Sequence, residues 1–200
     1  MKTEILPFSP PSFTEEEQKA VLECIKSSWV GTGPKTIEFE NLFANYKQSA
    51  FAGALSSCTS ALFLSLKTLG IGKGDEVITT AMTFCSTVNV ILHCGAKPVL
   101  CDIEESSKNI NTDNLERLIN SKTKAIIPVH YAGFPCDMDK IIELANKYEL
   151  SVIEDCAHAI ESKFNNKHCG TFGDIGCFSF YATKNMAIGE GGMAISDHEN

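Results

Sequence analysis

Short apolar runs alternate along this chain with longer segments whose apolar residues recur at helical spacing. Seven of the short runs are predicted strands, at residues 51–55, 76–80, 97–102, 124–129, 151–155, 175–180 and 192–196. Four helices are predicted between them, at residues 61–69, 83–94, 112–120 and 138–148. Strands that alternate with helices form parallel sheets covered on both faces. The pattern therefore predicts an α/β fold with a mostly parallel seven-stranded sheet sandwiched by helices.

Two further helices are predicted before the first strand. Thr14 and Glu17 form a capping box that opens the first of them. The second covers residues 37–46, after a glycine-rich break. Residues 163–168, with two asparagines at the centre, are typical of a hairpin turn. No repeat or low-complexity linker marks a domain boundary within the chain.

Composition excludes several classes of protein. The chain has 200 residues, 44% of them hydrophobic, and a formal net charge of −8 without a basic block. This argues against a nucleic-acid or anionic-membrane partner. Residues 1–11 do not have the pattern of a signal peptide, and no apolar run approaches the ~18 residues of a membrane span. Nine cysteines without a Cys-x-x-Cys pair are typical of buried free thiols, and we expect a cytoplasmic protein.

Candidate functional residues follow the predicted strands. Ligands of open α/β sheets bind beyond the carboxyl ends of the strands. The first strand is followed by residues 56–60, and the second by Thr83 and Phe84. Asp155 ends the fifth strand, and Ser179 and Lys184 lie at or just after the end of the sixth. Because these positions share one edge of the predicted sheet, we expect them to surround one ligand.

Lys184 and Asp155 are the most informative of these residues. A lysine past one strand and a carboxylate at the end of another are the two fixed points that pyridoxal 5′-phosphate (PLP) needs. The amine forms the Schiff base, and the carboxylate keeps the ring nitrogen protonated. An exposed surface lysine and a helix-capping aspartate are the alternatives. The apolar strand before Lys184 and the glycine-rich turn after it favour PLP.

Two other positions suit the same cofactor. The turn that contains Thr59 and Ser60 offers hydroxyls and free amides at a helix N-terminus, which suit a phosphate, although it can also be a plain helix cap. It is not a Walker loop, because Gly-x-x-x-x-Gly-Lys is absent. Phe84 can stack on a flat heteroaromatic ring or belong to the core.

His158 allows several interpretations. It can be structural, support Asp155, or bond the phenolic oxygen of the cofactor. With Cys156, His168 and Cys169 it also suggests zinc, but the spacing fits no familiar metal pattern. We therefore predict no metal site.

Five motifs together resemble the sugar-nucleotide aminotransferases of the PLP fold-type I superfamily. They are WVGTGP (29–34), GIGKGDEVI (70–78), TKAIIPVHYAG (123–133), IEDCAHA (153–159) and GTFGDIGCFSFYATKN (170–185). The resemblance covers residues 29–197 and is strongest to enzymes that aminate 4-keto sugars on UDP or dTDP. It implies an N-terminal helical arm at residues 1–35 and a PLP-binding large domain at residues 36–200.

The resemblance also implies a role for each matching residue. Lys184 and Asp155 are catalytic, and the other contacts to PLP come from Thr59, Ser60, Phe84, His158 and Ser179. The implied reaction transfers an amino group from L-glutamate to a nucleotide-linked keto sugar, as in polysaccharide or lipopolysaccharide biosynthesis. The implied assembly is a homodimer with shared active sites.

Members of that family are nearly twice as long as this chain and carry a smaller C-terminal domain. We therefore expect the chain to represent the large domain alone, and to fold poorly, bind PLP weakly or be inactive unless the rest is supplied. Two rival functions are a PLP-dependent sugar dehydratase and a truncated non-catalytic scaffold or regulatory protein. The dehydratases of the superfamily carry histidine in place of the lysine, so Lys184 favours the aminotransferase.

Overall fold

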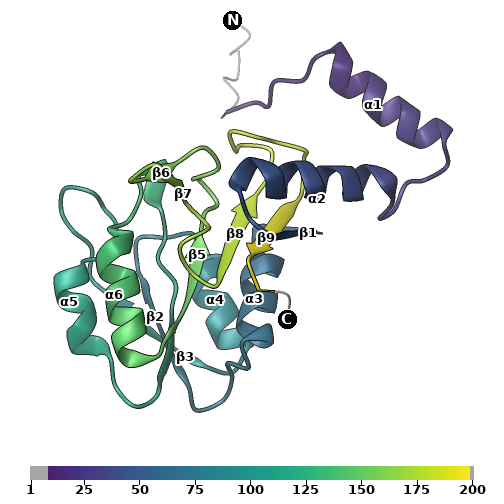
Figure 1. Cartoon of the computed structure of the whole chain (residues 1–200). Coiled ribbons are helices and arrows are strands. Elements are labelled where there is room, and N and C mark those ends of the chain that lie inside the picture. Colours follow the sequence, from purple (N-terminus) through teal and green to yellow (C-terminus); the bar gives the residue numbers. More distant parts are fainter. Residues whose placement is uncertain (1–8, 199–200) are drawn as a thin grey trace, which may run out of the picture.

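Seven strands form one twisted sheet in the computed structural model, which describes residues 9–198. The strands are β1 (Phe51–Leu55), β2 (Glu76–Thr80), β3 (Lys97–Cys101), β4 (Thr123–Ile126), β5 (Ser151–Asp155), β8 (Ile175–Ser179) and β9 (Gly192–Ser196). Their order is β1-β9-β8-β5-β4-β2-β3 (Figure 1). Only β9 runs antiparallel to its neighbours β1 and β8. The other pairs are parallel, which confirms the predicted fold class.

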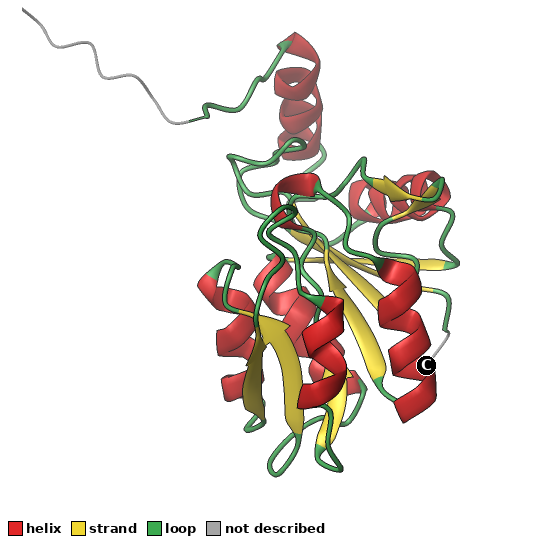
Figure 2. Cartoon of the chain, turned by 90° about the vertical axis from the view of Figure 1, so that its left-hand side faces the viewer, coloured by secondary structure: helices red, strands yellow, loops and turns green. Residues whose placement is uncertain are grey.

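Helices cover both faces of the sheet (Figures 1 and 2). The pair α3 (Cys58–Thr68) and α4 (Cys85–His93) packs on the face that contains Val77 and Ile153. The pair α5 (Thr112–Leu118) and α6 (Met138–Tyr148) packs on the face that contains Ile78 and Val152. Successive residues of a strand point to opposite faces, so each central strand supplies apolar side chains to both layers.

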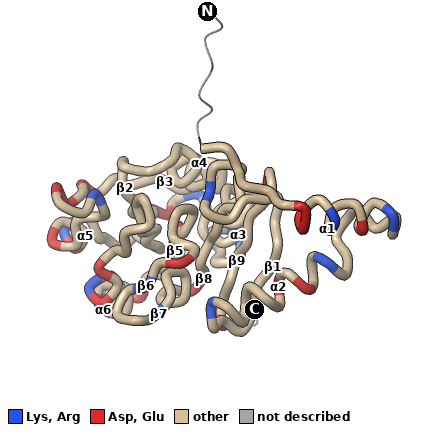
Figure 3. The backbone as a smooth tube through the Cα atoms, turned by 90° about the horizontal axis from the view of Figure 1, so that it is seen from above, with Lys and Arg blue, Asp and Glu red and all other residues tan. Residues whose placement is uncertain are grey.

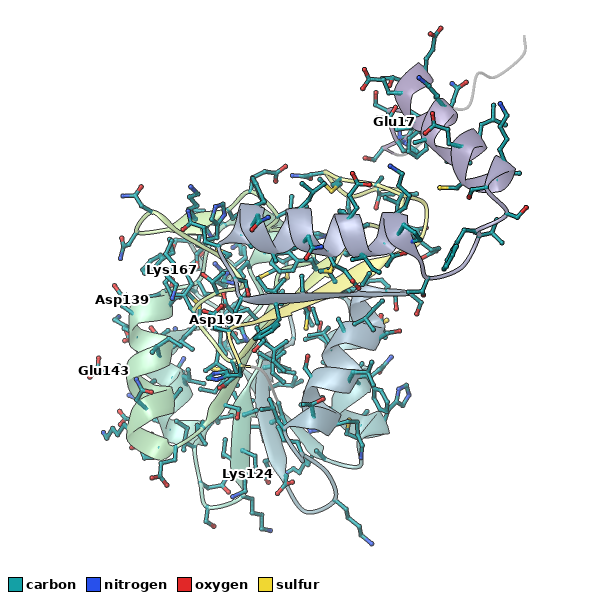
Figure 4. All side chains as sticks on the ribbon, turned by 45° about the vertical axis from the view of Figure 1, so that its right-hand side comes forward. Glu17, Lys124, Asp139, Glu143, Lys167 and Asp197 are labelled. Atoms are coloured by element: carbon teal, nitrogen blue, oxygen red, sulfur yellow. The ribbon has the colours of Figure 1, made fainter. Side chains whose placement is uncertain are left out.

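The N-terminal part of the chain has two different helices. The helix α2 (Pro34–Lys47) packs through Phe43 on Phe178, with ring centroids 5.0 Å apart, and so covers β8 and β9. The helix α1 (Glu15–Lys26) starts at the predicted Thr14 capping box but has no buried residue. It projects away from the sheet, with Glu17 far from the body of the molecule (Figures 1 and 4).

Several boundaries differ from the sequence prediction. The strand predicted at residues 124–129 ends as β4 at Ile126, because Pro128 has no N–H to donate to a ladder. The helix predicted at residues 83–94 begins only at Cys85, since Phe84 is extended (φ −69°, ψ 144°) and is the N-cap. The segments predicted at 97–102, 112–120 and 175–180 are shorter by one or two residues, and α3 starts three residues earlier than predicted.

The predicted hairpin is present as β6 (Lys163–Phe164) and β7 (Lys167–His168), with Asn165 and Asn166 at positive φ in the turn. Acidic and basic residues are interspersed along α1, α5 and α6 (Figure 3). No helix within residues 9–198 is both long enough and apolar enough to cross a membrane.

Candidate active site

A cavity of about 520 Å³ opens at the carboxyl ends of β2, β5 and β8. Six of the seven predicted site residues lie on its wall: Thr59, Phe84, Asp155, His158, Ser179 and Lys184. Ser60 is not on the wall. The topology explains the assembly, because parallel neighbouring strands end at one edge of the sheet and their following loops meet there.

Asp155 is the last residue of β5 and is 4% exposed. Its Oδ2 accepts a hydrogen bond from the hydroxyl of Thr87 at 2.8 Å, and its Oδ1 accepts one from the backbone N–H of Ala157 at 3.1 Å. The residues after Asp155 form a turn and not a helix, so Asp155 is not a helix cap and His158 does not lie on a helix. The carboxylate is thus held from the protein side and faces the cavity.

Lys184 lies in the turn after β8 and is partly buried. Burial lowers the pKa of its amine, although the carboxylate of Asp155 and the thiol of Cys58 act in the opposite direction. Within the described residues, neither Lys184 nor Asp155 forms an ion pair. The cavity therefore contains an amine with weakened basicity, which favours its nucleophilic neutral form.

His158 borders the same cavity. Desolvation lowers its pKa, the positive charge of Lys184 lowers it further, and Asp155 opposes both effects. The imidazole is therefore neutral at pH 7, and one of its nitrogens can accept a hydrogen bond.

Phe84 is 75% exposed, which excludes the core position that the sequence left open. It is the N-cap of α4, and its side chain makes no capping bond. An aromatic ring that stays exposed on a cavity wall offers a face to a planar ligand.

The N-terminus of α3 forms another part of the wall. Ser57 is the N-cap and accepts a hydrogen bond from the backbone N–H of Ser60 at 3.1 Å. The Ser60 hydroxyl lies 3.0 Å from the hydroxyls of Ser56 and Ser57. Ser60 is therefore engaged within the cap, whereas Thr59 faces the cavity. Gly192 lets α3 approach β9 here, because a Cβ at residue 192 would lie 2.2 Å from the carbonyl carbon of Ser57.

A closed polar cluster lies beside the cavity, around the fully buried Glu154. The carboxylate accepts hydrogen bonds from Nε2 of His130 (2.9 Å) and from the backbone N–H groups of Gly170 (2.7 Å), Phe172 (2.7 Å) and Gly173 (2.9 Å). Burial alone raises the pKa of Glu154, but the hydrogen bonds from His130 and these amides outweigh it, so the pKa lies below its usual value.

The same cluster has the residue types of a metal site. Ligand atoms of His130, Glu154 and Cys156 lie within 4.8 Å of one another. However, Nδ1 of His130 accepts a hydrogen bond from the backbone N–H of Cys136 at 3.1 Å, so Nε2 carries the proton that Glu154 accepts. Both ring nitrogens and both carboxylate oxygens are thus engaged in hydrogen bonds, which account for the cluster without a metal ion.

Several residues of the cavity were not predicted. Thr83, which was expected at this edge, lies on the wall, and so do His130, Tyr131, Thr183 and Glu190, which were not singled out. Three of these four lie within the quoted motifs and Glu190 lies six residues after Lys184, but their orientation had no sequence signal. Thr87, which bonds Asp155, follows Thr83 at helical i, i+4 spacing, and that spacing is the signal that could have found it.

A larger hollow of about 740 Å³ runs along β1, β9 and α3. Its ionisable side chains are Asp174, Asp197 and His198, and its exposed ring is Phe51 (46%), but no lysine among residues 9–198 lines it. The smaller cavity combines an amine, a carboxylate, an imidazole and an aromatic face, and so it is the candidate active site.

Comparison with known proteins agrees with this geometry. The family model of the DegT/DnrJ/EryC1/StrS aminotransferase family matches residues 11–200. The chain is 52% identical to protein MJ1066 of Methanocaldococcus jannaschii over 199 residues, which is 100% of this chain and 52% of that protein. It is 48% identical to the spore coat polysaccharide biosynthesis protein SpsC of Bacillus subtilis, over 99% of this chain and 51% of that protein. The chain thus spans about half the length of the curated relatives it matches.

Solved structures give the same result. Spr1654 of Streptococcus pneumoniae, described as a sugar aminotransferase, superimposes in its PLP form with a TM-score of 0.93 at 38% identity, over 97% of this chain and 53% of that one. PseC of Helicobacter pylori, an aminotransferase in pseudoaminic acid biosynthesis, has a TM-score of 0.92 at 33% identity, over 98% and 53%. The chain therefore belongs to the DegT/DnrJ/EryC1/StrS family of sugar aminotransferases, which use PLP.

Proposed function

We propose that this chain is the PLP-binding part of an aminotransferase that acts on a nucleotide-linked keto sugar. One observation carries the proposal: the Lys184 amine and the Asp155 carboxylate line one cavity, where the carboxylate acts on the pKa of the amine. Bound PLP would supply an electron-accepting ring and a carbonyl group that carries the amino group between donor and acceptor.

The side chains on the wall fit the cofactor. Lys184 offers its amine to the aldehyde carbon, and its lowered pKa leaves it able to accept and return a proton. Asp155 has both oxygens bonded from the protein side and can accept a further hydrogen bond from a protonated ring nitrogen. Phe84, whose ring is exposed, would stack on the cofactor ring, and neutral His158 would hydrogen-bond to the phenolic oxygen.

The N-terminus of α3 holds the phosphate in this proposal. Thr59 and Ser179 contribute hydroxyls on the cavity wall, and the positive end of the helix dipole favours the dianion. Ser60 acts differently from Thr59, because its hydroxyl and amide are bonded to the cap. It shapes the turn that presents the phosphate site.

The wider assignment rests on the relatives. SpsC is named for spore coat polysaccharide biosynthesis and PseC for the biosynthesis of pseudoaminic acid. We assign to this chain a 4-keto sugar on UDP or dTDP as acceptor, L-glutamate as donor, and a cytoplasmic location, where its nine free cysteines stay reduced. We also assign residues 1–35 to an N-terminal arm and residues 36–200 to the large domain, and we expect further substrate contacts from the smaller C-terminal domain that the resemblance implies.

The assembly proposed is a homodimer. Apolar side chains of α1 and α2 are exposed, including Val21 (61%), Ile25 (59%) and Leu42 (61%). Such a run of exposed apolar residues on two helices favours a contact with a second subunit.

Borohydride trapping tests the proposal. The 200-residue chain is incubated with PLP, reduced with borohydride and mapped by mass spectrometry. We expect the label on Lys184, loss of that label in Lys184→Arg, and no effect of Lys147→Arg. A label spread evenly over surface lysines, unchanged by Lys184→Arg, would refute the proposal. Turnover with L-glutamate and a keto sugar, with and without the C-terminal half of a relative, then tests the reaction.

A further inference from the structure

A short chain of hydroxyl groups leads from the cavity wall to the buried carboxylate of Asp155. The Oγ1 atoms of Thr83 and Thr87 are 2.7 Å apart, and Thr87 Oγ1 lies 2.8 Å from Oδ2 of Asp155. Thr87 is fully buried, whereas Thr83 lies on the cavity wall. The three residues come from the loop after β2, the first turn of α4 and the end of β5.

The direction of the hydrogen bonds follows from the number of protons. A hydroxyl has one proton to donate, and Thr87 donates its proton to Asp155. The contact between the two threonines must therefore be donated by Thr83. Its remaining lone pairs are then free on the cavity wall, and the chain runs from Thr83 through Thr87 to Asp155.

The arrangement fixes how the carboxylate is presented. One oxygen is bonded by Thr87 and the other by the backbone N–H of Ala157. With a donor on each oxygen from the protein side, the plane of the carboxyl group is set, and the free lone pairs face the cavity.

We propose that Thr87 is a positioning residue for Asp155, and that Thr83 orients the Thr87 hydroxyl so that the carboxylate meets a protonated heteroaromatic nitrogen. This inference rests on the proposed function, because it assigns Asp155 to the ring nitrogen of PLP. Neither threonine touches the reacting atoms, and both act through the carboxylate.

Valine and serine separate a hydrogen-bonding role from a packing role at residue 87. Thr87→Val keeps the shape and removes the donor, whereas Thr87→Ser keeps the donor and removes a methyl group. We expect Thr87→Val to weaken PLP binding about tenfold, because a hydrogen bond to a charged group is lost. Thr87→Ser should stay within about twofold of the unmodified chain, and Thr83→Val should lose about threefold.

A spectroscopic readout tests the role directly. The absorbance of bound PLP is titrated against pH in each variant. The pH midpoint of the absorbance change should move in Thr87→Val and return to the value of the unmodified chain in Thr87→Ser. If Thr87 only filled space, the midpoint would not depend on whether residue 87 has a hydroxyl. Thr112→Val is the matched control: the buried Thr112 hydroxyl has no partner among residues 9–198, and its removal should change neither binding nor midpoint.

A double-mutant cycle without cofactor keeps the two proposals separate. Thr87→Val should raise the unfolding equilibrium constant about tenfold in the unmodified chain, and by less than about twofold in Asp155→Ala, where the acceptor is gone. Equal effects in both backgrounds, or equal losses of PLP affinity in Thr87→Val and Thr87→Ser, would overturn the positioning role. Failure of the Lys184 label, with the coupling intact, would overturn the proposed function instead.

Discussion

Two carboxylates that are adjacent in the chain, Glu154 and Asp155, occupy opposite kinds of environment. Both belong to β5, and successive residues of a strand point to opposite faces. Glu154 receives four hydrogen bonds from groups of the protein and is closed off from solvent. Asp155 receives two, both from the protein side, and faces a cavity of about 520 Å³.

The difference distinguishes a carboxylate with a structural role from one that can bind a ligand. A buried carboxylate whose lone pairs are all satisfied stabilises the fold and has no capacity left for a ligand. A buried carboxylate that accepts hydrogen bonds from the protein side only keeps lone pairs free for a ligand in the cavity. Glu154 thus fixes the loop at residues 170–173 through its hydrogen bonds, and the next residue, Asp155, belongs to the candidate active site, so one strand positions both.

The largest expected effect is on the closed cluster. Glu154→Ala leaves three backbone N–H groups and the N–H of His130 without an acceptor, at about 1–3 kcal/mol each. We expect the free energy of unfolding in urea to fall by about 4 kcal/mol or more.

If Glu154→Ala does not fold, Glu154→Gln, which keeps one acceptor, should show a smaller loss in the same direction. Glu143→Ala is the control, because Glu143 points into solvent from α6 (Figure 4) and should change stability by less than about 0.5 kcal/mol. A Glu154→Ala chain as stable as Glu143→Ala would contradict the structural role.

Substitution of Asp155 should have a small effect on stability and a large effect on PLP binding. Asp155→Asn keeps an oxygen for Thr87, so we expect a loss of stability of at most about 1 kcal/mol. PLP affinity, measured by absorbance or fluorescence titration, should fall about 10- to 100-fold, because a charged hydrogen-bond acceptor for the ring nitrogen is lost. Asp139→Asn, at an exposed aspartate of α6, should leave affinity unchanged. A large loss of stability in Asp155→Asn without any change in PLP affinity would show that Asp155 has a structural role like that of Glu154.

Substitution of Phe84 on the cavity wall should have a smaller effect on PLP binding than substitution of Asp155. Phe84→Ala should change the free energy of unfolding by less than about 0.5 kcal/mol, because the side chain is 75% exposed. Loss of ring stacking should weaken PLP binding about two- to tenfold. Phe134→Ala removes another exposed ring, 60% accessible and outside the cavity lining, and should have no effect on binding. Equal binding by both variants would remove Phe84 from the cofactor site.

The smallest effect is a pH dependence of stability caused by Lys184. Its pKa in the folded chain lies below the value of 10.5 that applies when it is unfolded. Between these two values the unfolded chain binds more protons, so stability rises with pH through that interval. The difference in unfolding free energy between the unmodified chain and Lys184→Met should follow this rise.

Lys147 gives the opposite sign as a comparison. Glu116 raises its pKa above 10.5, so its contribution is present below 10.5 and is lost as the pH rises through the folded value. A wild-type to Lys184→Met difference with the sign expected for Lys147 would show that Lys184 is not desolvated.

The sequence predicted the elements well where the periodicity was strong. Apolar runs in β2 and β5 and the capped helices α1 and α6 were recognisable because local residue patterns and caps determine them. The ends were less predictable: β4 stops before Pro128, and Phe84 stays extended ahead of α4. The predicted apolar face of α1 was not found buried, because it has no partner among the described residues.

Most of the candidate site was also predictable, because the carboxyl ends of parallel strands converge whatever their sequence separation. Thr87 and His130 were not. Their partners lie 68 and 24 residues away in the chain, and no periodicity connects residues across such distances.

By itself the sequence determined the alternation of strands and helices, and it placed a lysine and a carboxylate at the ends of two strands. The sequence also singled out Asp155 as the carboxylate for the ligand, whereas only the tertiary structure decided that Glu154 is closed off by four hydrogen bonds and that the Thr87 hydroxyl holds Asp155. The physical reason is that hydrogen bonds between distant segments depend on strand order and side-chain direction, and these are set only when both faces of the sheet are packed.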